Sequence, residues 1–270
     1  MKFGTAIGVV ISIVGIAMGA TMEGTSVMVV LNIPAALIVL VGTLGATIAA
    51  CGLPVHIRLP KLYMKAIMPP DLDLVGRVNE LVGFADQARR DGLLALDEAV
   101  KGIDDPFTRK GIQLVVDGTD PDLVAAVLDA ENEAMRKRHA ASRAPFMQAG
   151  ALAPTMGIIG TVFGLVNVMN NLNQPSTLGP LIAAAFLATL MGVGSANIVF
   201  LPMANRLKEL SEAEMHFREM TLEGVLAIQA GDNPRVVAEK LITFVPPAQR
   251  PAEDGSVPGS ASANDQRAAA

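Results

Sequence analysis

Residues 146–168 read FMQAGALAPTMGIIGTVFGLVNV and residues 178–203 read LGPLIAAAFLATLMGVGSANIVFLPM, and these two apolar runs decide the fold. Each is long enough to cross a bilayer, which takes about 20 apolar residues in a helix. No Asp, Glu, Lys or Arg occurs between Arg143 and Arg206, and only a short polar turn separates the runs. The pattern predicts a transmembrane helical hairpin.

The N-terminal part holds two more such runs, Phe3–Met22 and Ile33 to about Leu53. Before Arg58 the only charged residues are Lys2 and Glu23. A cleaved signal peptide is the alternative for the first run, but its length and the second run that follows at once favour a hairpin. We therefore predict an all-α, polytopic membrane protein with four transmembrane helices and a helical cytoplasmic domain between the second and third spans.

The composition agrees with a membrane protein and argues against an enzyme. Apolar residues make up 51% of the chain and charged residues 17%, below the roughly 25% of soluble domains. The sequence has no phosphate-binding loop, dinucleotide-binding glycine pattern or nucleophile elbow. Its one cysteine, Cys51, lies in a predicted span, and His56, His139 and His216 are scattered. We expect no catalytic site, no metal site and no cofactor.

The basic residues predict the orientation in the membrane. Residues 54–144 carry thirteen of the 21 Lys and Arg residues, and the chain from Asn205 carries seven. The turns at about 23–32 and 169–177 carry none. By the positive-inside rule, both termini and the large loop are cytoplasmic in the cell membrane. Acidic residues share these segments, so the net charge of −5 does not point to a nucleic-acid partner.

Helix signals divide the chain into five parts. Asp71 precedes an amphipathic stripe that Gly92 interrupts, and Asp120-Pro121 predicts the start of a further helix. That helix has no stop signal before Ala144 and can continue into the third span, and Asn233-Pro234 opens another short helix. The predicted parts are a first transmembrane hairpin at 1–53, a cytoplasmic helical domain at 54–144, a second hairpin at 145–204, cytoplasmic C-terminal helices at 205–245 and a disordered tail at 246–270.

The predicted spans contain no Asp, Glu, Lys or Arg, although a protein that carries ions on its own usually has one there. They do contain threonines. Thr161 and Thr189 are equally far from Pro175 at the predicted tip of the turn, about 14 residues or roughly 21 Å along each helix. We expect both at one depth near the middle of the membrane. If ions cross here, their carrier comes from another polypeptide, or the pore uses only hydroxyls and carbonyls.

Two prolines predict a second level in the same hairpin. Pro154 and Pro202 are centred near residue 178, close to the turn, so we expect them at one depth near the cytoplasmic face. A proline in a span frees a backbone carbonyl and can kink the helix. The alternative is that the threonine hydroxyls bond within their own helices and that the prolines merely begin or end spans.

Glycines four residues apart permit close helix packing in membranes. This spacing occurs at Gly15/Gly19 and at Gly160/Gly164. Chance is the alternative in a chain with 25 glycines.

Four stretches resemble the MotA family, the stator subunits of the bacterial flagellar motor, within the wider MotA/TolQ/ExbB group. Residues 32–43 are similar to the second-span motif, and residues 88–98, ARRDGLLALDE, to the charged cytoplasmic motif. Residues 153–165, APTMGIIGTVFGL, and residues 178–202 are similar to the third and fourth spans. The resemblance runs from about residue 1 to 245.

The resemblance implies an assembly and a mechanism. Members form a pentamer around two copies of a MotB-type subunit, which brings an ion-carrying Asp on its single span and a peptidoglycan-binding domain. Ion flow rotates the ring of MotA-type subunits, and charges of the cytoplasmic domain engage the rotor protein FliG. The carboxylate missing from these spans would therefore come from the partner. The implied partners are the MotB-type subunit, FliG, further copies of the chain and membrane lipid.

The resemblance also implies roles for single residues. The charges that match the rotor-facing positions are Arg89, Arg90, Asp97 and Glu98. Many members have Glu where Asp97 stands, so whether Asp97 or Glu98 is the working acid stays open. The positions linked to coupling of ion flow and torque are Pro154 and Pro202, and those lining the ion path are Thr161 and Thr189.

The coupling ion and the function class have alternatives. Thr at both pore positions resembles sodium-type members, yet some proton-type members share it, and we favour protons. A TolQ/ExbB-type subunit that powers envelope processes is the first alternative function, and a non-conducting membrane scaffold is the second. The extra N-terminal hairpin and the charged motif at 88–98 argue against the TolQ/ExbB type.

Overall fold

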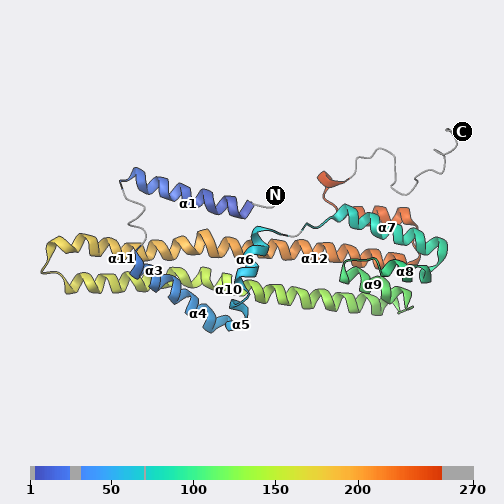
Figure 1. The fold of residues 1–270 in the computed structure, drawn as a ribbon, viewed down its shortest axis with the longest axis horizontal. Coiled ribbons are helices and arrows are strands. Elements are labelled where there is room, and N and C mark those ends of the chain that lie inside the picture. The colour runs from blue at the N-terminus through green and yellow to red at the C-terminus, as the bar shows by residue number, and fades with distance from the viewer. Residues whose placement is uncertain (1–3, 25–31, 70, 251–270) are drawn as a thin grey trace. The chain divides into compact units, whose positions relative to one another are not determined.

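The computed structural model describes residues 4–24, 32–69 and 71–250, and every regular element in these ranges is a helix (Figure 1). The predicted tail from 246 lies mostly outside the described residues. The elements in chain order are α1 (Gly4–Met22), α3 (Ile33–Ala36), the π-helix η1 (Leu37–Val41), α4 (Gly42–Cys51), α5 (Leu53–His56), α6 (Leu59–Ile67), α7 (Leu74–Asp91), the short 3₁₀ helix η2 (Leu93–Ala95), α8 (Leu96–Val100), α9 (Pro106–Val116), α10 (Pro121–Asn170), α11 (Pro175–Ser195), the π-helix η3 (Ala196–Phe200), α12 (Leu201–Ala230), α13 (Pro234–Ile242) and the 3₁₀ helix η4 (Pro247–Gln249).

Four helical runs are long and apolar enough to cross a membrane. They are Gly4–Met22, Ile33–Cys51, Pro121–Asn170 and Pro175–Gln229. The predicted all-helical class with four spans is thus confirmed, and the chain is a multi-pass membrane protein. The helix expected to start at Pro121 and to continue into the third span is also confirmed, since α10 has 50 residues. At 1.5 Å per residue, it is about 75 Å long and must extend beyond a hydrocarbon core of about 30 Å.

The chain divides into two compact units. The first, which we call the membrane unit, comprises the described residues before Pro70 together with Lys137–Ser211. The second unit comprises Asp71–Arg136 and the described residues from Glu212. Helices α10 and α12 contribute residues to both.

The second unit has its own apolar core. Its fully buried side chains come from α7 to α10, α12, α13 and the connection between α8 and α9, and the largest are Leu81, Leu96, Ile103, Phe107, Ile112, Leu128, Met220, Ile228 and Leu241. Asp73 and Asp105 cap α7 and α9 by accepting backbone N–H groups of the first turn. Gly92 ends α7 with a φ of +85°, a backbone conformation that glycine adopts without strain.

The membrane unit is held together by small residues between α10 and α11. A Cβ atom built on Gly192 would lie 2.6 Å from the Ala153 carbonyl oxygen, and one on Gly164 would lie 2.5 Å from the Ala185 Cβ. The close packing predicted for the Gly160/Gly164 pair is therefore confirmed. The same prediction for Gly15/Gly19 stays a prediction, because a Cβ on either would meet nothing within 4 Å among the described residues of this chain.

Helix α6 is anchored on the membrane unit by a small apolar cluster. Ala66 is fully buried together with Phe146 of α10 and with Met203 and Ala204 of α12. The ring of Tyr63 meets that of Phe146 edge to face, with ring centroids 5.0 Å apart. This contact fixes the chain that follows the second span against the helices of the second hairpin.

Candidate functional site

The second hairpin folds about the predicted tip. α10 ends at Asn170 and α11 starts at Pro175. Gly157 lies against Gly192 and Gly164 against Ala185, so paired positions are centred on residues 174–175. The register is set by these backbone contacts, which allow no larger side chain between the helices.

Thr161 and Thr189 meet in this hairpin, as predicted from their equal distance to the tip. Their hydroxyl groups form a direct hydrogen bond. The Thr161 hydroxyl also lies 3.1 Å from the carbonyl oxygen of Gly157 and 3.3 Å from that of Ala185. The bond from Thr161 to the Gly157 carbonyl lies within α10. Bonding of the Thr161 hydroxyl within its own helix, which was the alternative to pairing, therefore occurs together with the bond to Thr189. Since one hydroxyl has one hydrogen, Thr161 can donate to only one of these acceptors at a time.

The threonine pair opens onto an apolar face. Both threonines are half-buried, and the neighbouring side chains on the outer surface of α10 and α11 include Ile158, Val162, Phe163, Phe186 and Leu190, all exposed. Such a face suits lipid or another transmembrane helix. A neutral hydroxyl pair there can donate to a carboxylate or accept from a carboxylic acid, and it needs no charge of its own.

Pro154 and Pro202 do not share one level, so that prediction is wrong. The residue before Pro154 lies against Gly192, which is ten residues before Pro202. The residue before Pro202, Leu201, lies against Gly150, which is four residues before Pro154. Because each contact is made by the residue before the proline and the helices are antiparallel, the prolines are between 5 and 11 residues apart in level, or between about 7 and 17 Å at 1.5 Å per residue. The cause is the hairpin register, which is centred on residues 174–175 and not on residue 178.

A π-helix, η3, precedes Pro202 and was not predicted from the sequence. In η3 the backbone N–H of Leu201 donates to the carbonyl of Ala196, five residues back. Pro202 has no N–H to donate, and its ring would crowd the carbonyl of the residue four positions back in a regular α-helix. The wider turn therefore accommodates the proline within an unbroken helical run. A second π-helix, η1, interrupts the second span.

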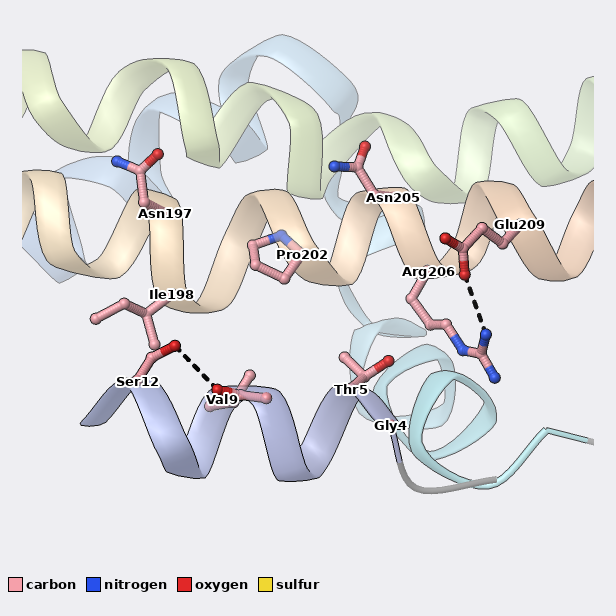
Figure 2. Close-up of a pocket in the computed structure, with 11 residues that line it drawn as sticks. Gly4, Thr5, Val9, Ser12, Asn197, Ile198, Pro202, Asn205, Arg206 and Glu209 are labelled. Carbon is pink, nitrogen blue, oxygen red and sulfur yellow. Dashed lines mark hydrogen bonds and ion pairs between the residues drawn. The ribbon is translucent and has the colours of Figure 1, made fainter. Parts of the chain in front are cut away.

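Pro202 also lines a cavity of about 550 Å³ between α1 and the η3–α12 run. Figure 2 shows Val9 and Ser12 of α1 on one side and Ile198, Pro202 and Arg206 on the other. Arg206 Nη1 lies 3.0 Å from Glu209 Oε2. The cavity thus has the polar residues Ser12 and Asn197 at one end and the Arg206–Glu209 ion pair at the other (Figure 2).

The four predicted rotor-facing charges lie in the second unit, on either side of one short turn. Arg89 and Arg90 occupy the last turn of α7, and Asp97 and Glu98 the first turn of α8. All four are exposed. These positions suit the partial charges of the helix ends, because basic groups are favoured at a C-terminus and acidic groups at an N-terminus.

Two of these charges have partners nearby. Arg90 Nη2 lies 3.2 Å from Asp86 Oδ2, and Glu98 Oε1 lies 2.7 Å from Lys101 Nζ. The hydrogen bond from Lys101, followed by its positive charge, holds the pKa of the Glu98 carboxyl below its ordinary value. Both pairs are solvent-exposed, and such pairs are worth only about 0–1 kcal/mol.

Among the described residues no group of three or more His, Cys, Asp or Glu side chains could hold a metal ion. The titratable groups lie on the exposed helices of the second unit and at the ends of the spans, while the centre of the second hairpin offers hydroxyls and carbonyls.

Comparisons with known proteins cover both units. Residues 99–220 match the model of the MotA/TolQ/ExbB proton channel family. Motility protein A of Bacillus subtilis is 34% identical over 248 residues, which are 90% of this chain and 91% of that protein. Chemotaxis protein PomA of Vibrio alginolyticus is 35% identical over 250 residues, 93% of this chain and 94% of that protein. The structure of the flagellar MotAB stator complex from Bacillus subtilis contains a chain that is 34% identical with a TM-score of 0.84, and the match covers 89% of this chain and 95% of that one.

Proposed function

This chain belongs to the MotA family of flagellar stator subunits, within the MotA/TolQ/ExbB proton channel group, and on that premise we propose how it works. It conducts ions, protons in preference to sodium, together with a MotB-type partner, and converts the flow into torque on a rotor. The observation that carries this proposal is the Thr161–Thr189 hydroxyl pair, which lies in a stretch without Asp, Glu, Lys or Arg.

The partner supplies the carrier. One solved relative is a complex of MotA with MotB, which supports a MotB-type partner here. Its span would lie on the apolar face beside Thr161 and Thr189 and bring the carboxylate that this chain lacks. An Asp there can be neutralised by a proton, which avoids the cost of a permanent charge in the membrane.

The hydroxyl pair then serves both states of that carboxyl. When the Asp is ionised, a threonine hydroxyl donates to it, and when the Asp is protonated, the hydroxyl accepts. The three acceptors within reach of Thr161 allow its hydrogen to be reassigned without moving the backbone. A proton path needs such exchangeable donors and acceptors, and this favours protons over sodium.

Coupling to motion uses Pro154 and Pro202. Each interrupts the backbone hydrogen bonding of its helix, and they do so at two levels of the hairpin. A change of charge near the threonines would bend α10 and α12 at these positions. The energy source is sufficient, because one charge moving across 100 mV releases about 2.3 kcal/mol.

The charges of the second unit contact the rotor. The two helix ends that flank the short connection from α7 to α8 expose both signs of charge, as Arg89, Arg90, Asp97 and Glu98. Because exposed ion pairs are weak, contacts with FliG can form and release at every step. This role places the second unit and both termini in the cytoplasm, in line with the distribution of Lys and Arg. The assembly is a pentamer around two partner copies.

The N-terminal hairpin favours this function over the TolQ/ExbB type. Helix α1 and the Ile33–Cys51 run form two spans ahead of the second unit. Two relatives that cover 90% and 93% of this chain are named a motility protein and a chemotaxis protein.

The test is motility of a stator-deleted strain that carries this chain and its MotB-type partner. We expect swimming with the wild-type pair, and loss of swimming with Thr161→Val plus Thr189→Val, since valine keeps the shape and removes the hydroxyl. Thr177→Val is the matched control, because the Thr177 hydroxyl donates to the Gln174 carbonyl at the start of α11 and, within the described part of the chain, to no threonine. Swimming that depends on the proton gradient and not on sodium supports protons. Normal swimming of the double variant would contradict the assignment of Thr161 and Thr189 to the ion path.

A further inference from the structure

The connection between α7 and α8 presents one apolar side chain to solvent. Leu94 of η2 is 78% exposed, whereas the other large apolar side chains exposed in the described part of the second unit, Leu123 and Val236, are 54% and 52% exposed. A single exposed leucine is ordinary on a protein surface. Its importance therefore depends on how it is held and on what surrounds it.

The backbone around Leu94 is fixed to the core of the second unit. On one side, Leu93 packs against that core, and on the other, Leu96 is fully buried in it. The side-chain amide of Gln87 donates a hydrogen bond of 3.0 Å to the carbonyl of Ala95. Leu94 is thus held outward by its neighbours before any partner arrives, so a contact through it requires little further ordering of the backbone.

Charges of both signs stand on the two sides of this leucine in the chain. Arg89 and Arg90 end α7, and Asp97 and Glu98 begin α8, and all four are exposed. An apolar centre with a charged rim is the usual composition of a protein–protein contact. The rim charges set orientation and specificity more than affinity, because exposed ion pairs are weak and are screened by salt. Burial of apolar surface is the term that supplies affinity.

We propose that Leu94 is the apolar anchor of the contact with the rotor. It enters an apolar recess of the rotor surface, whose rim carries acidic groups opposite Arg89 and Arg90 and basic groups opposite Asp97 and Glu98. The inference rests on the proposed contact between the second unit and the rotor, and it adds the side chain that gives this contact its salt-resistant part.

The surrounding charges favour a protein surface over a lipid surface as the occupant. The anionic headgroups of a membrane would attract Arg89 and Arg90 but repel Asp97 and Glu98. One side chain is also a small apolar area, so the contact can still release at every step, whereas a permanent interface buries a large apolar area.

The experiment measures binding of purified FliG to the complex of the full chain with its MotB-type partner in lipid nanodiscs. The dissociation constant is determined at about 0.1 M and about 1 M salt, where the Debye length is about 10 Å and about 3 Å. Leu94→Ala should raise the dissociation constant about tenfold at both salt concentrations, because the lost apolar contact is not screened. Reversal of both Arg89 and Arg90 to Glu should weaken binding at low salt and have little effect at high salt.

Two further variants separate loss of the anchor from loss of structure. Leu94→Met keeps an apolar side chain of similar volume and should bind nearly as the wild type does. Leu123→Ala is the matched control, because it shortens another exposed leucine of the second unit that lies outside the connection between α7 and α8.

The outcomes distinguish this inference from the proposed function. If the arginine reversal weakened binding and Leu94→Ala did not, the anchor would be wrong and the rotor contact would stand. If the effect of Leu94→Ala disappeared at high salt, Leu94 would act only by placing the charges, and the anchor would also be wrong. If neither change affected binding, or the wild-type complex bound no FliG, the proposed rotor contact would fail and the anchor with it. A changed mass of the assembled complex with Leu94→Ala, at unchanged affinity for FliG, would identify a second copy of the chain as the occupant and overturn the proposal.

Discussion

Gly192→Ala tests whether the threonine pair depends on the close contact of α10 and α11. A Cβ atom at this position would lie 2.6 Å from the Ala153 carbonyl oxygen and 3.0 Å from the Gly157 Cα atom. Both neighbours are backbone atoms and cannot rotate away. To reach an ordinary contact of 3.4 Å, the helices must separate by about 0.8 Å at this level.

That separation acts on the hydroxyl pair because Gly192 lies three residues from Thr189, about one helical turn. Overpacking of this kind costs about 1–3 kcal/mol, which we expect to appear as a lower melting temperature of the purified protein. The weakened Thr161–Thr189 contact should also reduce ion flux by the complex with its MotB-type partner. Thermal unfolding and flux into vesicles are therefore both measured.

Gly194→Ala is the control on the same helix. A Cβ there would meet nothing within 4 Å, and alanine is a better helix former than glycine by about 1 kcal/mol. We expect Gly194→Ala to be as stable as the wild type or slightly more stable, with normal flux. If Gly192→Ala matched this control in both assays, the reasoning from backbone contact to threonine pairing would be refuted.

Three further predictions concern the charges and the proline. Reversal of both Arg89 and Arg90 to Glu should lower motor torque at high load, and charge reversal on the rotor should restore part of it. The free energy of unfolding should change by less than about 1 kcal/mol, because both side chains are exposed. Unchanged torque would contradict the proposed contact with the rotor. Lys101→Gln should return the pKa of Glu98 upward toward its ordinary value of 4.5, as followed by NMR titration, because Lys101 lowers it. The Glu98–Lys101 pair therefore stabilises the fold above about pH 4.5, and this effect is lost as the pH falls through the lowered pKa of Glu98. If Lys101→Gln left the titration of Glu98 unchanged, the effect of Lys101 on that pKa would be contradicted. Pro202→Leu should impair swimming while the protein stays in the membrane, as judged by motility and membrane fractionation, and normal motility would argue against a coupling role.

The sequence was sufficient for features that depend on neighbouring residues. The charge-free stretch between Arg143 and Arg206 predicts the second hairpin, because charges are excluded from the hydrocarbon core. Asp120-Pro121 and Gly92 predict helix ends, because capping and backbone freedom are local properties. The Thr161–Thr189 contact was also predictable, because it depends only on distance from a tight turn.

Other features depend on packing that the pattern does not encode. The offset between Pro154 and Pro202 follows from which glycines meet across the hairpin, and a shift of a few residues in the register changes it. The π-helices depend on one extra residue in a turn, which leaves the apolar pattern unchanged. Helix α1 is apolar on all sides, so its sequence does not tell which face meets the fourth span or that a cavity lies beside Arg206.

The central claim is that conduction needs a carboxylate from the partner, because the predicted spans of this chain contain no Asp, Glu, Lys or Arg. Proton uptake into vesicles with an imposed membrane potential tests it most directly. The measurement compares this chain alone, its complex with the MotB-type partner, and the complex whose partner Asp is replaced by Asn. The account predicts uptake by the complex only. Uptake by this chain alone, or by the complex with Asn, would contradict it.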